Sequence, residues 1–391
     1  MITVIGIGED GLSGLAPTAR ALVENAEVLM GGTRHLAMVP AGTAERLEWA
    51  SPFGDSRPAL QSRRDRRVVV LASGDPMWFG AGATLAGWFD PAEITVIPHP
   101  GAFSLAAARL IWPLHEVACL TAHGRPVEAL ALHFAPGRRL LILSEDAATP
   151  TKVADLLAHH GYGPSRMAVL ENLGGPFERI HPGPAAGSNL NVVAVECVAA
   201  AGGHPLSLAP GLPDDAFLHD GQLTKREIRA VTLATLAPLA GELLWDVGAG
   251  SGSVAIEWMR AGGRAVAIEH KPERIDRIAR NALALGVPGL EIVAGRAPDS
   301  LPLDGDEPDA IFVGGGVSEA SLLDICRSAL KSGGRLVANA VTAEGEAALI
   351  AFHACHGGDM TRLAVSRLGE VGGFHTWHPA MPVTQYLGRK K

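Results

Sequence analysis

A glycine-rich loop in the second half constrains this chain more than any other feature of its sequence. The apolar run Leu243 to Val247 leads into Gly248-Ala249-Gly250-Ser251-Gly252, and a helical segment, Val254 to Arg260, follows. A strand, a tight glycine turn and a helix N-terminus form a cradle for a nucleotide or nucleoside, because glycine lets a ligand approach the backbone. A second apolar run ends at Glu269, whose carboxylate can accept both hydroxyls of a ribose. The sequence therefore predicts a doubly wound α/β domain that binds a nucleoside cofactor.

The spacing of the glycines distinguishes between classes of cofactor. Ser253 stands where the dinucleotide pattern G-x-G-x-x-G requires its third glycine, and no phosphate-binding lysine follows the loop. Asp246 instead precedes a G-x-G-x-G pattern, which resembles motif I of the Rossmann-like S-adenosylmethionine (SAM) methyltransferases. Two alternatives stay open. One is an NAD(P)-dependent oxidoreductase, although no hydride-transfer constellation accompanies the loop; the other is a noncatalytic module that senses SAM or binds RNA.

The length of 391 residues is sufficient for two domains. A stretch dense in Pro and Gly, Ala199 to Gly221, has no sustained helical or strand period, so we expect a first domain at 1–200, a linker at 201–221 and a second domain at 222–391. On both sides of the linker, apolar runs alternate with helical patterns, which predicts parallel sheets. The expected strands are 2–5, 68–71, 94–97, 140–143 and 192–195 in the first domain, and 243–247, 265–269, 291–293, 310–313 and 336–338 in the second.

Composition and charge exclude several classes of function. Hydrophobic residues make up 47% and charged residues 19% of the chain, which indicates packed cores rather than disorder. A formal net charge of -8 disfavours binding to nucleic acid or to an anionic membrane. The four cysteines form no CxxC pair, the start of the chain has no leader pattern, and no apolar run reaches the ~18 residues of a membrane span. We therefore expect a cytoplasmic protein with reduced thiols.

The second domain is similar to the precorrin decarboxylating methyltransferase family, which acts at carbon 15 of the corrin precursor. The resemblance is carried by QLTKREIRAVTLATL, LLWDVGAGSGSVAIEW, AIEHKPER, GRAPDSL and DAIFVGGG, in this order. It implies a Rossmann-like class I fold and a SAM site made by Thr224, Asp246, the loop from Gly248 to Gly252, Glu269 and Ala297. Family members often have Asp at the position of Glu269. The sequence Thr224-Lys225-Arg226-Glu227 also predicts a capping box before a helix at Ile228 to Leu236.

Three glycine loops follow predicted strands in the first domain. They are Gly6-Ile7-Gly8, then Gly74-Asp75-Pro76, then Pro100-Gly101-Ala102-Phe103-Ser104. Because the carboxyl ends of parallel strands meet at one edge of a sheet, these loops should line one crevice. The set resembles the tetrapyrrole (corrin/porphyrin) methylase family, whose class III methyltransferase fold binds SAM between two α/β lobes.

A branch of that family methylates carbon 5, and two further segments are similar to it: Thr121 to Arg125 and Glu171 to Gly174. The resemblance implies a SAM site that contains Gly8, Gly74, Asp75, Ser104 and Thr121. Gly8-Glu9-Asp10-Gly11 departs from the family, which usually has G-P-G here.

A tetrapyrrole methylase joined to a decarboxylating methyltransferase is the arrangement of a family of bifunctional enzymes in aerobic cobalamin biosynthesis. The resemblance covers almost the full chain. It implies SAM-dependent methylation of precorrin-6Y at C5 and C15, with decarboxylation of the C12 acetate side chain, to give precorrin-8x. It also implies two SAM sites per chain, a tetrapyrrole as the small-molecule partner, and no nucleic acid or membrane partner. We expect the protein to be a homo-oligomer.

Methyl transfer from a sulfonium requires alignment and exclusion of water rather than a nucleophilic side chain. Accordingly, the sequence contains no Ser/His/Asp or Cys/His signature, and it identifies no catalytic residue. A macrocycle fringed by carboxylates favours cationic partners, of which Arg can bind a carboxylate bidentately. The substrate-binding candidates are His123, Arg125, Lys225 and His270. Two histidine pairs, His353 with His356 and His375 with His378, lack a completing pair, so we predict no metal site.

Overall fold

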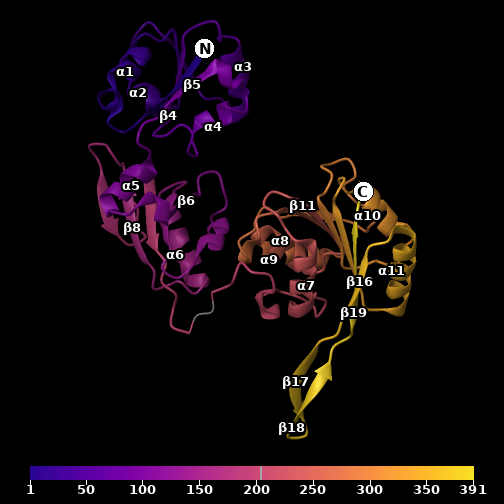
Figure 1. Ribbon diagram of the computed structural model, residues 1–391. Coiled ribbons are helices and arrows are strands. Elements are labelled where there is room, and N and C mark those ends of the chain that lie inside the picture. The colour runs from indigo at the N-terminus through magenta and orange to yellow at the C-terminus, as the bar shows by residue number, and fades with distance from the viewer. Residues whose placement is uncertain (203–204) are drawn as a thin grey trace. The chain divides into compact units, whose positions relative to one another are not determined.

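The computed structural model describes residues 1–202 and 205–391 (Figure 1). The chain divides into two compact units, Met1–Val127 with His133–Gly203 and Glu128–Leu132 with His204–Lys391. No helix in the described ranges has the length and apolar character to cross a membrane. Short 3-10 helices are η1 (Gly11–Gly14), η2 (Phe53–Ser56), η3 (Pro91–Glu93), η4 (Leu114–Glu116), η5 (Val127–His133) and η6 (Asp214–Ala216).

The first unit begins with a fully parallel five-stranded sheet of order β3-β2-β4-β1-β5. Alternate residues of β1 serve opposite faces: Ile2 and Val4 join one buried cluster, whereas Ile5 and Ile7 join another. Helices therefore cover both faces, as a buried parallel sheet requires. The strands are β1 (Ile2–Ile7), β2 (Val28–Gly31), β3 (Glu45–Glu48), β4 (Val68–Ser73) and β5 (Ile94–Ile97); the helices are α1 (Pro17–Glu24), α2 (Thr33–Ala37), α3 (Arg57–Gln61) and α4 (Ala81–Leu85).

A second five-stranded sheet, of order β6-β7-β10-β8-β9, corrects the expectation of parallel pairing in this half. Among the neighbouring strands of this sheet, only β6 and β7 pair in parallel; β10 pairs antiparallel with β7 and β8, and β8 pairs antiparallel with β9. The chain from β8 to β10 contains no helix that could make a parallel crossover, so it returns by short connections. The elements are β6 (Val117–Thr121), β7 (Arg139–Leu143), β8 (Arg166–Glu171), β9 (Arg179–Pro182), β10 (Asn191–Glu196), α5 (Ala102–Leu110) and α6 (Thr149–His159).

The second unit contains a seven-stranded sheet of order β13-β12-β11-β14-β15-β19-β16. Its first five strands are parallel and include all five expected ones, and the strand order reverses between β11 and β14. Ligands of doubly wound sheets bind at such a reversal. The elements are β11 (Leu243–Val247), β12 (Arg264–Glu269), β13 (Glu291–Ala294), β14 (Ala310–Val313), β15 (Arg335–Ala340), α7 (Arg226–Leu236), α8 (Ser253–Arg260), α9 (Pro272–Ala284), α10 (Leu322–Ala329) and α11 (Ala343–His356).

Four strands at the end of the chain were not expected from the sequence. β19 (Val383–Arg389) lies between β15 and β16 (Asp359–Leu363) and is antiparallel to both. β17 (Ser366–Val371) and β18 (Phe374–Pro379) form a separate two-stranded hairpin that projects away from the sheet of this unit (Figure 1).

Part of the expected linker is packed structure. Leu212 and Phe217 are at most 3% exposed and belong to the core cluster that also contains Leu233 and Ile278. The backbone N–H groups of Gly211 and Leu212 donate to the buried Glu257 carboxylate. A sequence without a helical or strand period can still bury isolated apolar residues, and this segment does so against α7, α8 and α9. Independent folding of the two halves stays a prediction.

Candidate cofactor and substrate sites

A cavity of about 760 Å³ lies at the carboxyl ends of the parallel strands in the second unit. Its walls come from the loops after β11, β12, β13 and β14 and from the segment before α7. Most of the residues predicted for this half line it together: Thr224, Lys225, Asp246, Gly248, Ala249, Gly250, Ser251, Glu269, His270 and Ala297. Gly252 is the remaining one, and it is the N-cap of α8 at φ 75°.

The glycine loop makes the close approaches that its sequence suggests. Gly248 has φ 71°, and a Cβ added there would lie 3.0 Å from the Cα of Gly315 in the loop after β14. At Gly250, with φ 62°, the nearest atom to an added Cβ is the carbonyl oxygen of Gln222 at 3.6 Å. Gly248 therefore allows two loops to pack at the strand reversal, whereas a Cβ on Gly250, which lines the cavity, would make only an ordinary van der Waals contact.

Glu269 is held in a fixed position at the end of β12. It is 2% exposed; its Oε1 accepts from the N–H groups of His270 and Lys271 at 2.9 and 3.0 Å, and its Oε2 accepts from Gly250 N–H at 3.0 Å. The Nδ1 of His270 lies 3.2 Å from the same carboxylate. These donors orient the carboxylate toward the glycine loop, and each carboxylate oxygen has further acceptor capacity for a ribose hydroxyl.

Asp246 and Ser251 each carry a buried polar atom that lacks a protein partner among the described residues. The Asp246 Oδ2 accepts from Ala255 N–H at 3.0 Å, whereas its Oδ1 and the Ser251 Oγ accept and donate nothing there. Burial, together with the nearby Glu269 carboxylate, raises the pKa of Asp246 to about 7. Because buried polar atoms in native proteins are nearly always paired, these two atoms of the cavity lining fit a polar ligand.

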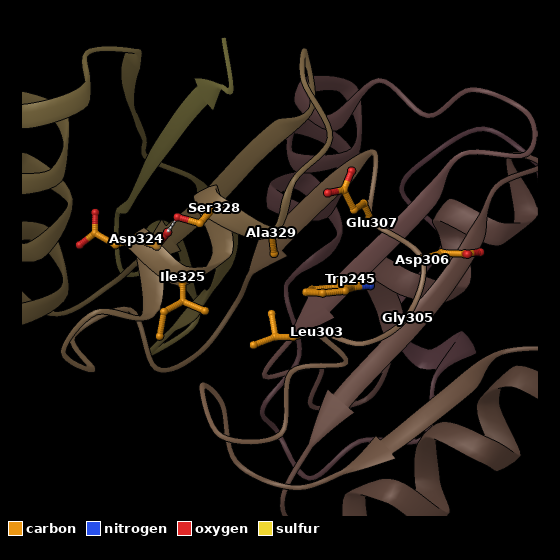
Figure 2. A pocket seen from close by; sticks show the side chains of 9 residues that line it. All are labelled: Trp245, Leu303, Gly305, Asp306, Glu307, Asp324, Ile325, Ser328 and Ala329. Atoms are coloured by element: carbon orange, nitrogen blue, oxygen red, sulfur yellow. Dashed lines mark hydrogen bonds between the residues drawn. The ribbon is translucent and has the colours of Figure 1, made fainter.

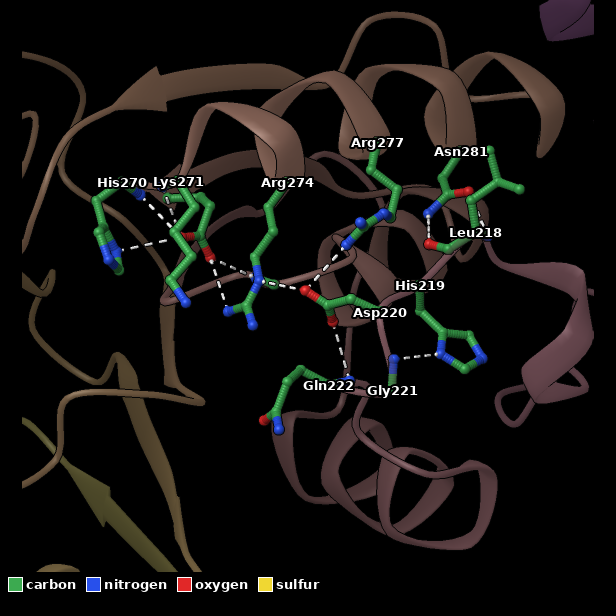
Figure 3. A network of polar contacts seen from close by, with 12 residues as sticks. Leu218, His219, Asp220, Gly221, Gln222, His270, Lys271, Arg274, Arg277 and Asn281 are labelled. Carbon is green, nitrogen blue, oxygen red and sulfur yellow. Dashed lines mark hydrogen bonds and ion pairs between the residues drawn. The ribbon is translucent and has the colours of Figure 1, made fainter.

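Residues 221–225 form one wall of the cavity, and the preceding residues 218–220 tie this wall to the helix α9 (Figure 3). Asn281 bonds both the N–H and the carbonyl of Leu218, at 2.8 and 3.0 Å. Asp220 pairs with Arg274 at 2.9 Å and with Arg277 at 3.2 Å, and the other side of Arg274 reaches Glu269 at 4.0 Å. Arg274 thus contacts both Asp220, beside the wall, and Glu269, the predicted ribose-binding carboxylate.

Thr224 takes a different role from the expected helix cap. α7 begins at Arg226 with Lys225 as its N-cap, and no side chain caps it, so the capping box prediction is wrong. The carbonyl of Thr224 instead accepts from Arg229 at 2.5 Å, and Arg229 is fully buried against Glu257. The Arg229 guanidinium therefore holds the backbone of the cavity wall at Thr224, and no side chain caps the start of α7.

Several cavity residues were missed from the sequence. Arg274 belongs to no local motif, Arg367 lies in the unexpected hairpin, and Met381 follows that hairpin. Asp220, which pairs with Arg274 just outside the lining, was missed as well. Asn339 lines the cavity from the end of β15, where Gln385 Nε2 donates to its Oδ1 at 2.9 Å. The sequence gives one signal for Asn339: it is a polar residue that directly follows the expected strand 336–338.

The loops predicted for the first unit also converge. A Cβ on Gly74, which has φ 54°, would lie 2.6 Å from the Cα of Gly101, and one on Gly6 would lie 1.9 Å from the carbonyl oxygen of Gly74. Gly8 is close to the side chains of Asp10 and His99. The three glycine loops therefore meet, as expected.

The other residues predicted for this unit have varied surroundings. The Asp75 Oδ1 accepts from Met77 N–H at 2.9 Å, so Asp75 also orders its own loop. Ser104 is exposed in the first turn of α5, and Thr121 ends β6, where its Oγ1 accepts from His123 N–H. The His123 Nδ1 lies 3.1 Å from Glu145. Arg125 is exposed and lies over the Phe79 ring.

A second cavity in the second unit, of about 440 Å³, contains none of the predicted residues (Figure 2). Trp245 and Ile325 form its apolar part, and Asp306, Glu307 and Asp324 stand at its edge. Because Trp245 alternates with Asp246 along β11, this cavity lies on the other side of that strand from the glycine loop.

Comparison with known families gives two matches that together span most of the chain. Residues 1–187 match the tetrapyrrole (corrin/porphyrin) methylases, and residues 215–390 match the precorrin methyltransferase domain. A Salmonella typhimurium cobalt-precorrin-7 C(5)-methyltransferase is 34% identical over 48% of this chain and 93% of its own length. A probable cobalt-precorrin-6B C(15)-methyltransferase (decarboxylating) of Sulfolobus acidocaldarius is 31% identical over 34% of this chain and 73% of its own length.

A full-length relative combines the two activities in its name. The precorrin-6Y C(5,15)-methyltransferase (decarboxylating) of a Sinorhizobium species is 50% identical over 100% of this chain and 96% of its own length. The fold expected from the sequence, a tetrapyrrole methylase followed by a Rossmann-like methyltransferase, is confirmed. This chain therefore belongs to the family of decarboxylating precorrin-6Y C(5,15)-methyltransferases.

Proposed function

We propose that the two methylations are divided between the halves of the chain, each with its own SAM site. The chain is a SAM-dependent C-methyltransferase that modifies precorrin-6Y at C5 and C15, with loss of the C12 acetate carboxyl group as carbon dioxide, in cobalamin biosynthesis. C5 methylation takes place in the first unit, and C15 methylation with decarboxylation takes place in the second. Relatives that carry one activity each support this division.

The cavity of the second unit carries this proposal furthest. Bound SAM supplies an activated methyl group, so the protein has to orient it and keep water away. Glu269 receives the ribose hydroxyls, the Gly248 to Gly252 loop lies along the cofactor, and the unpaired Asp246 Oδ1 and Ser251 Oγ face polar groups of it. Lys225, from the segment before α7, and His270, from the loop after β12, line the cavity and are candidates to meet substrate carboxylates. When the bond between the acetate methylene and its carboxylate breaks, the conjugated macrocycle can accept the electron pair, and the methylene carbon then takes up a proton to become a methyl group.

In the first unit, the converging loops support a second SAM site. Gly8, Gly74 and Asp75 contribute from the first sheet, and Ser104 and Thr121 contribute from α5 and β6. The chain also acts as a homo-oligomer in this proposal. The exposed Phe374 and Trp377 of the hairpin support self-association, which sedimentation velocity of the full chain measures.

Calorimetric titration with S-adenosylhomocysteine tests the two-site proposal. The full chain should bind two equivalents, and Glu269→Ala should weaken one site and leave the other unchanged. Glu273→Ala, in the first turn of the neighbouring α9 and outside the cavity lining, is the matched control and should leave both sites unchanged. A wild-type stoichiometry of one overturns the division into two centres.

A further inference from the structure

Three consecutive large apolar side chains are exposed directly after the Gly74-Asp75-Pro76 loop. Met77, Trp78 and Phe79 are 48%, 44% and 44% exposed. Their backbone is well fixed: Asp75 accepts from Met77 N–H through Oδ1 and from Trp78 N–H through its carbonyl, at 2.9 and 3.2 Å. Phe79 is held at φ 54°, an unusual conformation for a residue with a side chain. These three side chains are therefore exposed to solvent on a backbone that hydrogen bonds hold in place.

A buried aromatic ring supports this surface from below. Phe103, 3% exposed in the first turn of α5, has its ring centroid 5.5 Å from that of Trp78 and 6.1 Å from that of Phe79. These separations are typical of favourable aromatic pairs. The two exposed rings thus pack on α5, whose N-cap Gly101 belongs to one of the loops of the proposed cofactor site.

A cation completes the surface. The guanidinium of Arg125 lies 5.6 Å from the Phe79 ring centroid. Arg125 is exposed and forms no ion pair with any side chain in the part of the chain that the structure describes, whereas its neighbour His123 is paired with Glu145. Its charge is therefore available to an incoming anion, and its planar fork suits a carboxylate.

We propose that Trp78, Phe79 and Arg125, here called the Trp78 patch, bind the precorrin at the C5 methylation centre. The apolar face of the macrocycle packs on the two rings, and one peripheral carboxylate pairs with Arg125. A ring system with an apolar face and an anionic edge matches an aromatic surface beside one unpaired cation. This proposal rests on the proposed placement of C5 methylation in the first unit.

The shared loop explains why substrate and cofactor would meet here. Gly74 and Asp75 belong to the proposed SAM site, and Trp78 and Phe79 follow them on the same ordered turn. A macrocycle on the Trp78 patch is therefore held beside the methyl donor, and the patch acts by positioning it. Truncating a ring should raise the KM for C5 methylation more than it changes the affinity for the cofactor.

The test uses the full chain, precorrin-6Y and SAM, with C5 methylation, C15 methylation and carbon dioxide release followed separately by mass spectrometry. Trp78→Ala and Phe79→Ala should each raise the KM for C5 methylation about tenfold, a change typical of a lost aromatic stacking contact. Arg125→Met should raise it similarly, and Arg125→Lys should recover part of the loss because it retains the charge. Carbon dioxide release and S-adenosylhomocysteine affinity should stay at wild-type values.

Ile111→Ala is the matched control. Ile111 is 84% exposed and has φ 55°, so this variant also truncates an exposed apolar side chain at positive φ, but away from the patch. It should leave every rate unchanged. Unchanged C5 kinetics in Trp78→Ala, Phe79→Ala and Arg125→Met overturn the proposal. A change in the oligomeric state of these variants, measured by sedimentation velocity, also overturns it, because the patch then contacts a second copy of the chain.

A separate variant distinguishes failure of this inference from failure of the division into two centres. Gly74→Trp blocks the cofactor loop itself, so it should abolish C5 methylation. If it does so while the patch variants have no effect, the Trp78 patch is wrong and the first unit still methylates C5. If Gly74→Trp, shown to be folded, methylates C5 normally, the C5 centre lies elsewhere and both proposals fail.

Discussion

Asp220 and Arg274 form an ion pair of 2.9 Å that joins the cavity wall to the helix behind Glu269. Asp220, which directly precedes the wall, comes from the segment that the sequence suggested was a linker. Hydrogen bonding from Gln222 N–H, followed by the neighbouring arginines, holds the pKa of Asp220 far below its usual range. The pair is therefore charged under all conditions in which the enzyme works, and it connects the wall to the proposed ribose carboxylate.

Neutralising this pair should weaken one cofactor site. Asp220→Asn retains an acceptor for Gln222 N–H but releases Arg274 to turn toward Glu269. We expect S-adenosylhomocysteine affinity in the second unit to fall roughly fivefold, since partly exposed ion pairs contribute about 1 kcal/mol or less. Asp306→Asn, which removes an exposed pair with Arg264 at 3.4 Å, is the calorimetric control. An equal loss in both variants would contradict a specific role for Asp220.

Asp246 should make the stability of the second unit depend on pH. Its folded pKa of about 7 exceeds the unfolded value of about 3.9, so the folded chain holds a proton that the unfolded chain releases. The contribution of Asp246 to stability is thus full below pH 4 and declines as pH rises through 7.

Amide hydrogen exchange in β11 and α8 measures this effect within the second unit. As the pH rises from 5.5 to 7.5, the stability of Asp246→Asn relative to that of the wild type should increase by roughly 2 kcal/mol, since one pKa unit corresponds to about 1.4 kcal/mol. The comparison at each pH cancels the intrinsic pH dependence of exchange. Parallel curves for the two proteins would show that Asp246 stays ionised in the folded chain.

Bulky residues in the two glycine loops should cause different failures. Gly250→Trp adds a bulky side chain to the cavity lining and should leave an enzyme that cannot release carbon dioxide or methylate C15, with at most the C5 methyl group added. Gly74→Trp meets the Gly101 backbone and should retain decarboxylation and C15 methylation. Mass spectrometry of the products distinguishes the two. A folded Gly250→Trp enzyme that releases carbon dioxide at the normal rate requires the roles to be reassigned.

The segment before α7 should stabilise the second unit. A fragment that begins at residue 205 includes Leu212 and Phe217, whereas one that begins at 222 loses both from the core. Full burial of such a side chain contributes about 1.5–3 kcal/mol, so the longer fragment should unfold at clearly higher urea concentration. A partner fragment that ends near residue 202 should fold cooperatively by itself. If the fragment that begins at 205 and the fragment that begins at 222 are equally stable, the segment before α7 contributes nothing to the stability of the core.

The sequence predicts best where function depends on residues close together in the chain. The loop from Gly248 to Gly252 and the carboxylate of Glu269 sit at the ends of two apolar runs, and their spacing alone predicts a cradle. Asp220 and Arg274 meet only because α9 folds back beside the wall, and no local pattern records such a pairing. Motifs thus identify the glycine loop but not the side chains that hold it in place.

Strand direction was the main error in the fold. Apolar runs such as 140–143 and 192–195 predict buried strands, but periodicity carries no information about direction, and β7 and β10 are antiparallel. Polar or exposed strands were missed for a related reason: β16 and the β17–β18 hairpin have few buried residues. The aromatic residues at 78 and 79 look like core positions in the sequence, and only the folded loop reveals their exposure.

The position of β19 has a consequence for how the enzyme is made. Residues 383–389 insert between β15 and β16, and Gln385 then bonds Asn339 at the cavity and Thr232 on α7. While this segment is still inside the ribosome, β15 is an unprotected sheet edge, and Asn339 at the cavity can bond Thr232 but lacks its bond from Gln385. A nascent chain can therefore complete its first unit early, but the sheet that carries the cavity of the second unit is complete only after β19 has been released.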